Sequence, residues 1–212
     1  MTTPHTTTPH RHLRITEPSP WVRRFAPLVP RDRGDGRVLD LAAGGGRHAR
    51  LFLDRGHAVT ALDKAIEPLA EIGERAEVIE VDLEDSPPPF APGGALAGRT
   101  FAGVVVCNYL HRPLLPGLVG AVAAGGVFIY ETFARGNEIH TKPRNPDHLL
   151  RSGELLDTVR DELQVVAYEH GIIEKEAAIA GVIQRICAVR PLAITRDDGE
   201  PDPHPVYPTE TS

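Results

Sequence analysis

Short apolar runs recur along the first half of the chain, and each run ends at a carboxylate or amide side chain. These side chains are Asp40, Asp63, Asp82 and Asn108. Unbroken apolar runs of about four to eight residues predict buried strands of a parallel sheet, whose carboxyl ends lie at one edge. Because ligands of open α/β sheets bind at that edge, we expect these four side chains to converge on one site.

Helix signals stand between the predicted strands. Ser19 followed by Pro20 is typical of an N-cap and first helical position, and Trp21, Phe25 and Leu28 follow at roughly helical spacing. Further helices are predicted from residue 47 to a stop at residue 56, over residues 66–73, and from residue 114 to residue 122 with an end at residues 125–126.

The alternation of strands and helices predicts a doubly wound, Rossmann-like parallel sheet. Its strands are expected near residues 38–41, 58–62, 78–81, 104–107 and 127–130. Residues 86–98 are too rich in proline and glycine for a regular helix and predict an irregular crossover. Residues 163–169 and 181–190 predict two strands joined without a long helix, which indicates an antiparallel hairpin at one edge.

Both ends of the chain have the composition of flexible tails. Residues 1–18 are rich in Thr, Pro and His, and Pro and acidic residues predominate from residue 192 onward. Such segments bury too little apolar surface to offset the entropy of ordering. We therefore expect one domain over residues 19–191. His5, His10 and His12 could bind a metal ion, but the composition favours a disordered tail and we assign no metal site.

The stretch from residue 38 to residue 49 carries the strongest chemical signal. A strand ends in Asp40, a turn with Gly44 and Gly46 follows, and a helix begins, so free N–H groups and a positive dipole end face a ligand. The glycine spacing alone fits a loop that binds a dinucleotide, since Gly44, Gly46 and Ala49 match the pattern G-x-G-x-x-G/A. A carboxylate at Asp40 would repel a pyrophosphate, however, and suits a ligand with a cationic amino-acid end.

With these residues in view, the chain resembles the class I S-adenosyl-L-methionine (SAM)-dependent methyltransferases. Asp40, Ala42, Gly44 and Gly46 stand where that family has an acidic residue and three glycines, so Ala42 departs from the pattern. Residues 108–113 and 130–133 look like a bacterial branch likened to tellurite-resistance methyltransferases. The resemblance covers roughly residues 20–190 and implies a seven-stranded sheet whose seventh strand is antiparallel.

The resemblance also implies where the cofactor binds. Asp63 would accept hydrogen bonds from both ribose hydroxyls, Asp82 from the adenine amine, and the Leu83 N–H would meet a ring nitrogen. Arg47 could touch the methionine carboxylate, and Glu17 with the Trp21 helix would cover the site. The full cofactor set is Asp40, Ala42, Ala43, Gly44, Gly46, Asp63, Lys64, Asp82, Leu83 and Asn108.

Residues after the fourth and fifth predicted strands form the candidate acceptor side. His111 is the candidate general base, if the acceptor carries a proton that must be removed. Inward-pointing Arg112, Arg135 and Arg144 would favour an anionic acceptor. The expected substrate-facing residues are Tyr109, His111, Arg112, Glu131, Thr132, Arg135 and Arg144.

Composition narrows the function further. The formal net charge is −6 with both signs interspersed, so there is no extended basic face for nucleic acid and a small-molecule acceptor is favoured. No apolar run is long enough for a membrane span, and a cytoplasmic location is expected. Cys107 and Cys187 stand apart in apolar runs and predict buried, reduced thiols. Two alternatives stay open: an NAD(P)-dependent oxidoreductase, and a non-catalytic protein that binds SAM.

Overall fold

The computed structural model describes residues 15–85, 87–175, 178–192, 198 and 200–205. The N-terminal histidines, and with them most of the first predicted tail, lie outside this part. No helix within it is long and apolar enough to cross a bilayer.

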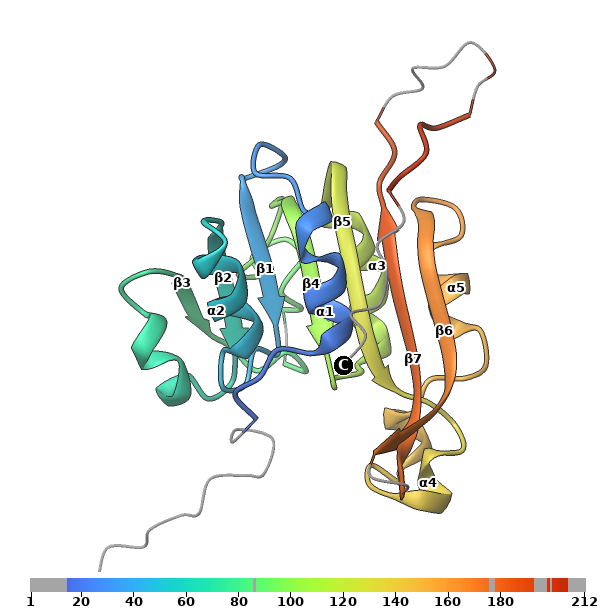
Figure 1. Ribbon diagram of the computed structural model, residues 1–212. Coiled ribbons are helices and arrows are strands. Elements are labelled where there is room, and N and C mark those ends of the chain that lie inside the picture. Colours follow the sequence, from blue (N-terminus) through green and yellow to red (C-terminus); the bar gives the residue numbers. More distant parts are fainter. Residues whose placement is uncertain (1–14, 86, 176–177, 193–197, 199, 206–212) are drawn as a thin grey trace, which may run out of the picture.

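A seven-stranded sheet forms the centre of the molecule, in the order β3-β2-β1-β4-β5-β7-β6 (Figure 1). The strands are β1 (Arg37–Leu41), β2 (Ala58–Asp63), β3 (Glu77–Glu80), β4 (Phe101–Cys107), β5 (Val122–Phe133), β6 (Gln164–Lys175) and β7 (Ala178–Val189). β1 to β5 pair in parallel, whereas β7 is antiparallel to both of its neighbours. The predicted sheet with an antiparallel edge hairpin is therefore confirmed.

Helices cover both faces of the sheet. The α-helices are α1 (Pro20–Phe25), α2 (Arg47–Asp54), α3 (Leu115–Gly120), α4 (Asn137–His140) and α5 (Glu154–Val159). Short 3₁₀ turns are η2 (Ala26–Leu28), η3 (Glu67–Ile72), η4 (Arg112–Leu114) and η5 (Pro146–His148). α1 packs against β5 and α2 against β1 and β2, while α3 and α5 lie on the opposite face (Figure 1). Each face buries its own apolar cluster.

The predicted start of the first helix is confirmed. The Trp21 N–H donates to Ser19 Oγ at 3.1 Å, and Pro20 opens the helix. Trp21, Val22 and Phe25 are at most 2% exposed. Apolar burial thus holds α1 on the sheet, since a helix of this length is marginal by itself.

Two predicted helices differ from the structure. Over residues 66–73 only the 3₁₀ segment η3 forms, and Pro68 near its start has no N–H to donate. α3 ends at Gly120, and Gly125 and Gly126 lie inside β5 instead of ending a helix. A Cβ on Gly126 would come within 2.9 Å of the Phe101 carbonyl oxygen, so this glycine allows β4 and β5 to approach closely.

The edge hairpin is longer than predicted. β6 and β7 each span 12 residues, and their far end projects with α4 beyond the carboxyl ends of β1 and β4 (Figure 1). The segment after β5 is tied to the end of β5 and to β7, because Leu150 N–H donates to Phe133 O at 3.0 Å and Ala134 N–H donates to Val182 O at 2.8 Å. These elements wall one side of the sheet's carboxyl edge.

Candidate active site

Polar residues lie at or near the carboxyl ends of four strands, at the edge where the sequence predicts a site. Asp40, Asp63 and Asn108 stand at or just after the ends of β1, β2 and β4, and Glu131 lies near the end of β5. The Asn108 N–H donates to Glu131 O at 2.9 Å, which joins two of these positions directly. Asp82 lies two residues beyond β3. Open α/β sheets bind their ligands at such an edge.

The loop after β1 turns through left-handed backbone. Ala42 has φ +56°, Gly44 +54° and Gly46 +72°. Ala42 therefore adopts a conformation that favours glycine, at the position where the resembling family has one. A Cβ on Gly46 would lie 2.8 Å from Leu69 Cδ2, so a larger residue there would displace the Leu69 side chain and would also be strained by the left-handed backbone.

Asp63 orients this loop through its carboxylate. Oδ2 accepts from the Gly44 N–H at 2.8 Å and Oδ1 from the Ala65 N–H at 3.1 Å. Each carboxylate oxygen has a second lone pair, so both oxygens can still accept from ligand hydroxyls. The neighbouring Lys64 is exposed at the same edge.

Asp40 has an internal partner. Its Oδ2 accepts from the Ala49 N–H at 2.9 Å, and the residue is only 1% exposed. The carboxylate faces the first turn of α2, and the place of Asp40 in the cofactor set stays a prediction. Burial raises the pKa of Asp40 to about 7, although the Ala49 hydrogen bond opposes that shift.

His48 lies beside Asp40 and is equally buried. Its Nδ1 is 4.0 Å from Asp40 Oδ1. This contact is not an ion pair at neutral pH, because burial and the nearby Arg47 lower the pKa of His48 to about 3. The neutral imidazole accepts a hydrogen bond from the Ser19 N–H at its Nε2, at 3.2 Å.

Tyr109, which the sequence places on the acceptor side, brings its hydroxyl close to the carboxylates of the expected adenine side. Asp82 is exposed and its Oδ1 accepts from the Glu84 N–H at 3.1 Å, whereas Leu83 is buried. The buried Tyr109 hydroxyl makes no hydrogen bond of normal geometry within the described chain. Burial, followed by the carboxylates of Glu84 and Asp82, raises the pKa of Tyr109. A hydroxyl and two carboxylates thus lie together here, so this corner suits a polar ligand.

The three arginines expected to attract an anion are placed differently from one another. Arg112 binds Glu154 at 2.7 Å and also donates to the carbonyl oxygens of Asp147 and Leu149. Arg135 pairs with Glu138 at 2.9 Å. Arg144 is exposed and has no ion pair among the residues that the structure describes. Two of the three charges are thus neutralised within the protein, and these contacts do not form a three-arginine wall.

Other acceptor-side residues differ in accessibility. Thr132 is 1% exposed and is held inside β5, whereas His111 is half-buried just before η4. Asn137 is fully buried, accepts from the Val182 N–H at 3.1 Å and donates to Pro143 O at 2.9 Å. Asn137 therefore shapes the segment after β5 and is not accessible to an acceptor.

Glu131 joins a polar group that the sequence analysis missed. The Ser19 hydroxyl donates to Glu131 Oε1 at 2.8 Å, the Cys107 thiol lies 3.6 Å from the same oxygen, and Arg185 pairs with Oε2 at 3.4 Å. Burial and then Glu131 raise the pKa of the Cys107 thiol, so it stays protonated. The sequence predicts Ser19 only as a helix cap, and no local pattern marks Arg185 as a neighbour of Glu131.

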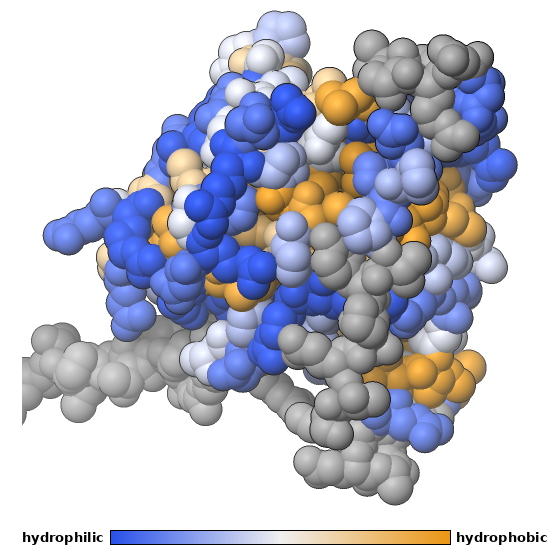
Figure 2. Space-filling model, turned by 45° about the horizontal axis from the view of Figure 1, so that its top comes forward, coloured by the Kyte–Doolittle hydropathy of each residue, from blue (hydrophilic) through white to orange (hydrophobic). Residues whose placement is uncertain are grey.

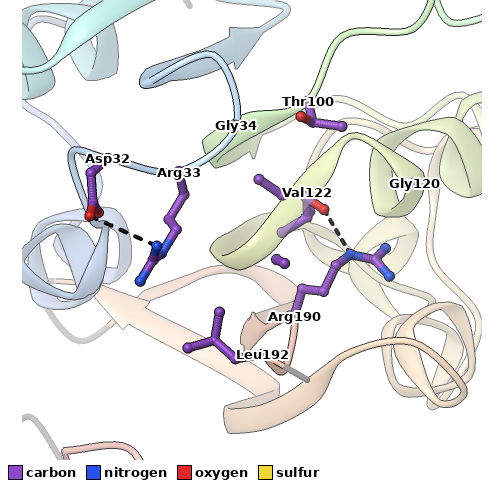
Figure 3. A pocket seen from close by; sticks show the side chains of 10 residues that line it. Asp32, Arg33, Gly34, Thr100, Gly120, Val122, Arg190 and Leu192 are labelled. Atoms are coloured by element: carbon purple, nitrogen blue, oxygen red, sulfur yellow. Dashed lines mark hydrogen bonds and ion pairs between the residues drawn. The ribbon is translucent and has the colours of Figure 1, made fainter. Parts of the chain in front are cut away.

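A hollow of about 580 Å³ lies at the opposite, amino-terminal edge of the sheet (Figure 3). Arg33 and Arg190 line it, but Arg190 already donates to Val122 O at 2.7 Å and to Glu162 at 2.8 Å. Figure 2 brings this edge forward and shows apolar side chains gathered at its centre. The hollow is remote from the converging carboxylates, so size alone does not identify the site.

Comparisons with known proteins bear on the fold. No protein-family model matches this chain, and no curated protein matches it. TehB from Haemophilus influenzae has a similar structure, with 16% identity, a TM-score of 0.61 and coverage of 80% of this chain. A TehB-like SAM-dependent methyltransferase from Corynebacterium glutamicum follows at 16% identity and a TM-score of 0.54, covering 81% of this chain and 87% of its own.

A third similar structure contains a ligand. The glycopeptide N-methyltransferase MtfA, complexed with S-adenosyl-L-homocysteine (SAH), has 21% identity and a TM-score of 0.52, with coverage of 82% of this chain and 90% of its own. This chain spans only 61% of the TehB chain from Haemophilus influenzae. The chain has the fold of the class I SAM-dependent methyltransferases, as its strand order and these likenesses show.

Proposed function

We propose that this chain is a SAM-dependent methyltransferase that acts on a small-molecule acceptor and releases SAH. The observation that supports this proposal most directly is the position of Asp40. Its carboxylate already binds the Ala49 N–H at the start of α2, which is where a dinucleotide fold would hold a pyrophosphate. The antiparallel β7 inside the sheet also departs from the all-parallel order of dinucleotide-binding folds.

The residues at the carboxyl edge fit the chemistry of SAM. Asp63 would accept from the ribose hydroxyls while keeping its two loop hydrogen bonds. The Tyr109 hydroxyl, together with Asp82, would supply polar partners for the adenine. Ala42, Ala43, Gly44 and Gly46 form the loop that would lie against the methionine and ribose portion. When bound, SAM supplies an electrophilic methyl group on a sulfonium centre.

The protein's own contribution would be largely positioning. An in-line displacement needs the acceptor held at a fixed distance and water excluded, and a base is needed only for an acceptor that carries a proton. Among the basic residues expected on the acceptor side, His111 and Arg144 make no ion pair within the described chain. The Cys107 thiol, kept protonated by burial, would not compete with the acceptor as a nucleophile.

Calorimetric titration of the purified chain with SAH, NAD and NADP tests the proposal. We expect binding of SAH in the micromolar range, at about −8 kcal/mol, and no heat with either nicotinamide ligand. Saturation with NADP and no response to SAH would instead identify an oxidoreductase. Once SAH binding is established, turnover of SAM with a panel of small acceptors separates an enzyme from a protein that only binds the cofactor.

A further inference from the structure

A row of polar side chains crosses the sheet beneath α1. Cys107, Glu131, Arg185 and Glu169 stand side by side on β4, β5, β7 and β6 in the strand register. On the same face, one step further into the sheet, lie Val105, Ile129 and Cys187, which are all fully buried. The row therefore marks the boundary between an apolar core and the carboxyl edge.

The segment that leads into α1 is fastened to this row. We call residues 15–19 the strap. Glu17 O accepts from Arg47 at 3.1 Å, and the Ser19 hydroxyl donates to Glu131 at 2.8 Å. In Figure 1 the dark blue strap passes in front of the carboxyl edge before it enters α1. The strap therefore lies beside the glycine loop, which Arg47 immediately follows.

Polar contacts, with little apolar burial, hold the strap in place. Ile15 is 42% exposed, and Thr16 and Glu17 are exposed as well. α1 differs, because Trp21, Val22 and Phe25 anchor it in the core. Segments with few buried apolar contacts open at low free energy while the rest of the fold stays intact. The exposed part of the strap, residues 15–17, can thus open without unfolding α1.

His48 connects the strap to the cofactor loop. The Ser19 N–H donates to His48 Nε2 at 3.2 Å, and His48 is the second residue of α2. On its other side His48 lies against Asp40 at the end of β1. Ser19 consequently bridges two of the sheet's central strands, with β1 reached through His48 and β5 reached through Glu131.

We propose that Ser19 is a positioning residue that latches the strap over the glycine loop, so that the cofactor enters and leaves only while this latch is open. The inference rests on the proposed function. A gate of this kind has a kinetic signature, because the fraction of time that it is open multiplies the association and dissociation rates equally. Loss of the latch accelerates both rates and leaves the dissociation constant nearly unchanged.

Stopped-flow fluorescence with SAH measures both rates. Trp21 is the only tryptophan of the chain and adjoins the latch, so it serves as the reporter. Ser19→Ala removes the donor to Glu131 and also the helix cap. Ser19→Asp keeps a side chain that caps a helix but sets a second carboxylate against Glu131. Ser19→Thr retains the hydroxyl and is the conservative rescue.

We expect Ser19→Ala and Ser19→Asp each to raise both rate constants about tenfold, the effect of one lost charge-assisted hydrogen bond. Ser19→Thr and the control Thr16→Ala, an exposed position in the strap, keep the original rates. Glu131→Gln removes the acceptor charge from the other side and raises both rates as well, which provides a second route if a Ser19 variant does not fold.

Three outcomes would contradict the gate. Unchanged rates in Ser19→Asp, with SAH still bound, would reduce Ser19 to a helix cap. A faster dissociation with unchanged association would mean that the strap touches the cofactor and does not gate it. No SAH binding to the unaltered chain overturns the proposed function itself and the gate with it, whereas the first two outcomes leave the function standing.

Discussion

The N–H of Ala49 donates to the Asp40 carboxylate at 2.9 Å, so a residue from the end of β1 closes the first turn of α2. An internal carboxyl group thereby occupies the place at which a helix start would otherwise attract a phosphate. The same carboxylate lies against His48, through which it reaches the strap. One buried side chain thus contacts both the start of α2 and the histidine that accepts from the Ser19 N–H.

Asp63 provides the first prediction. Asp63→Ala should lower the affinity for SAH at least about tenfold, because the two proposed hydrogen bonds to the ribose are removed and Gly44 loses its acceptor. Calorimetric titration measures the change. Asp54→Ala is the matched control, since it removes a carboxylate that pairs with Arg75 at an exposed position. Equal affinity in the two variants would exclude Asp63 from the cofactor site.

Glycine substitutions at the neighbouring residues Ala42 and Ala43 should differ in their effect on the free energy of unfolding. Ala42→Gly should change the free energy of unfolding by less than about 1 kcal/mol, because relief of the left-handed strain offsets the added entropy of the unfolded chain. Ala43→Gly has no such strain to relieve and should destabilise by about 1 kcal/mol or more. Denaturant unfolding compares them. Equal losses would show that φ at Ala42 carries no strain.

Arg112 is predicted to act on the structure of the loop after β5. Arg112→Ala should lower the free energy of unfolding by about 2 kcal/mol, because Glu154 and two carbonyl oxygens lose a charged donor. Arg112→Ala combined with Glu154→Ala should lose less than the sum of the single variants. Arg160→Ala, which breaks an exposed pair with Asp157, is the control and should leave stability unchanged.

The role of Arg112 on the acceptor side can be tested by a second measurement, the turnover of the acceptor by Arg112→Ala. If Arg112 only supports the loop, SAH affinity is unchanged and acceptor turnover falls in proportion to the loss of folded protein. A fall in turnover at full folding, measured under strongly stabilising conditions, would return Arg112 to the substrate-facing role that the sequence predicts. The two roles are distinguished by the pattern of turnover against folded fraction.

Two buried groups, His48 and Asp40, make the free energy of unfolding depend on pH in opposite directions. The folded-state pKa of His48 is about 3, below its ordinary 6.5, so its contribution to stability is present above pH 6.5 and is lost as the pH falls toward 3. The folded-state pKa of Asp40 is about 7, above its ordinary 3.8, so its contribution is present below pH 3.8 and is lost as the pH rises toward 7. Between pH 3.8 and 6.5 the two slopes oppose each other.

Substitution of one group should leave the pH dependence of the free energy of unfolding that the other group produces. For His48→Asn, the free energy of unfolding should fall with rising pH between 3.8 and 7, by up to about 1.4 kcal/mol per pH unit. For Asp40→Asn, it should fall with decreasing pH below 6.5. Denaturant unfolding over this range measures both slopes. Parallel pH profiles in the two variants would show that these buried groups do not control the acid response.

Much of the fold followed from local patterns. The apolar runs that end at a carboxylate or amide predicted β1, β2 and β4 and their common edge, and Ser19 with Pro20 predicted the start of α1. Gly125 and Gly126 were misread as a helix end, because a glycine that permits close strand approach looks the same in sequence as one that ends a helix. The pairing of β5 with β4 decided that these two glycines lie in a strand and do not end a helix.

The sequence by itself determined the order of elements, the glycine loop and the set of polar residues at the carboxyl edge, because these depend on residues that are near one another along the chain. Only the tertiary structure decided how those polar residues are used. Asp40 is turned toward Ala49, Arg112 is bound to Glu154, and Ser19 meets Glu131 across 112 positions of sequence. Hydrogen bonds between distant residues leave no periodic signal, since they form only after the strands have been brought together.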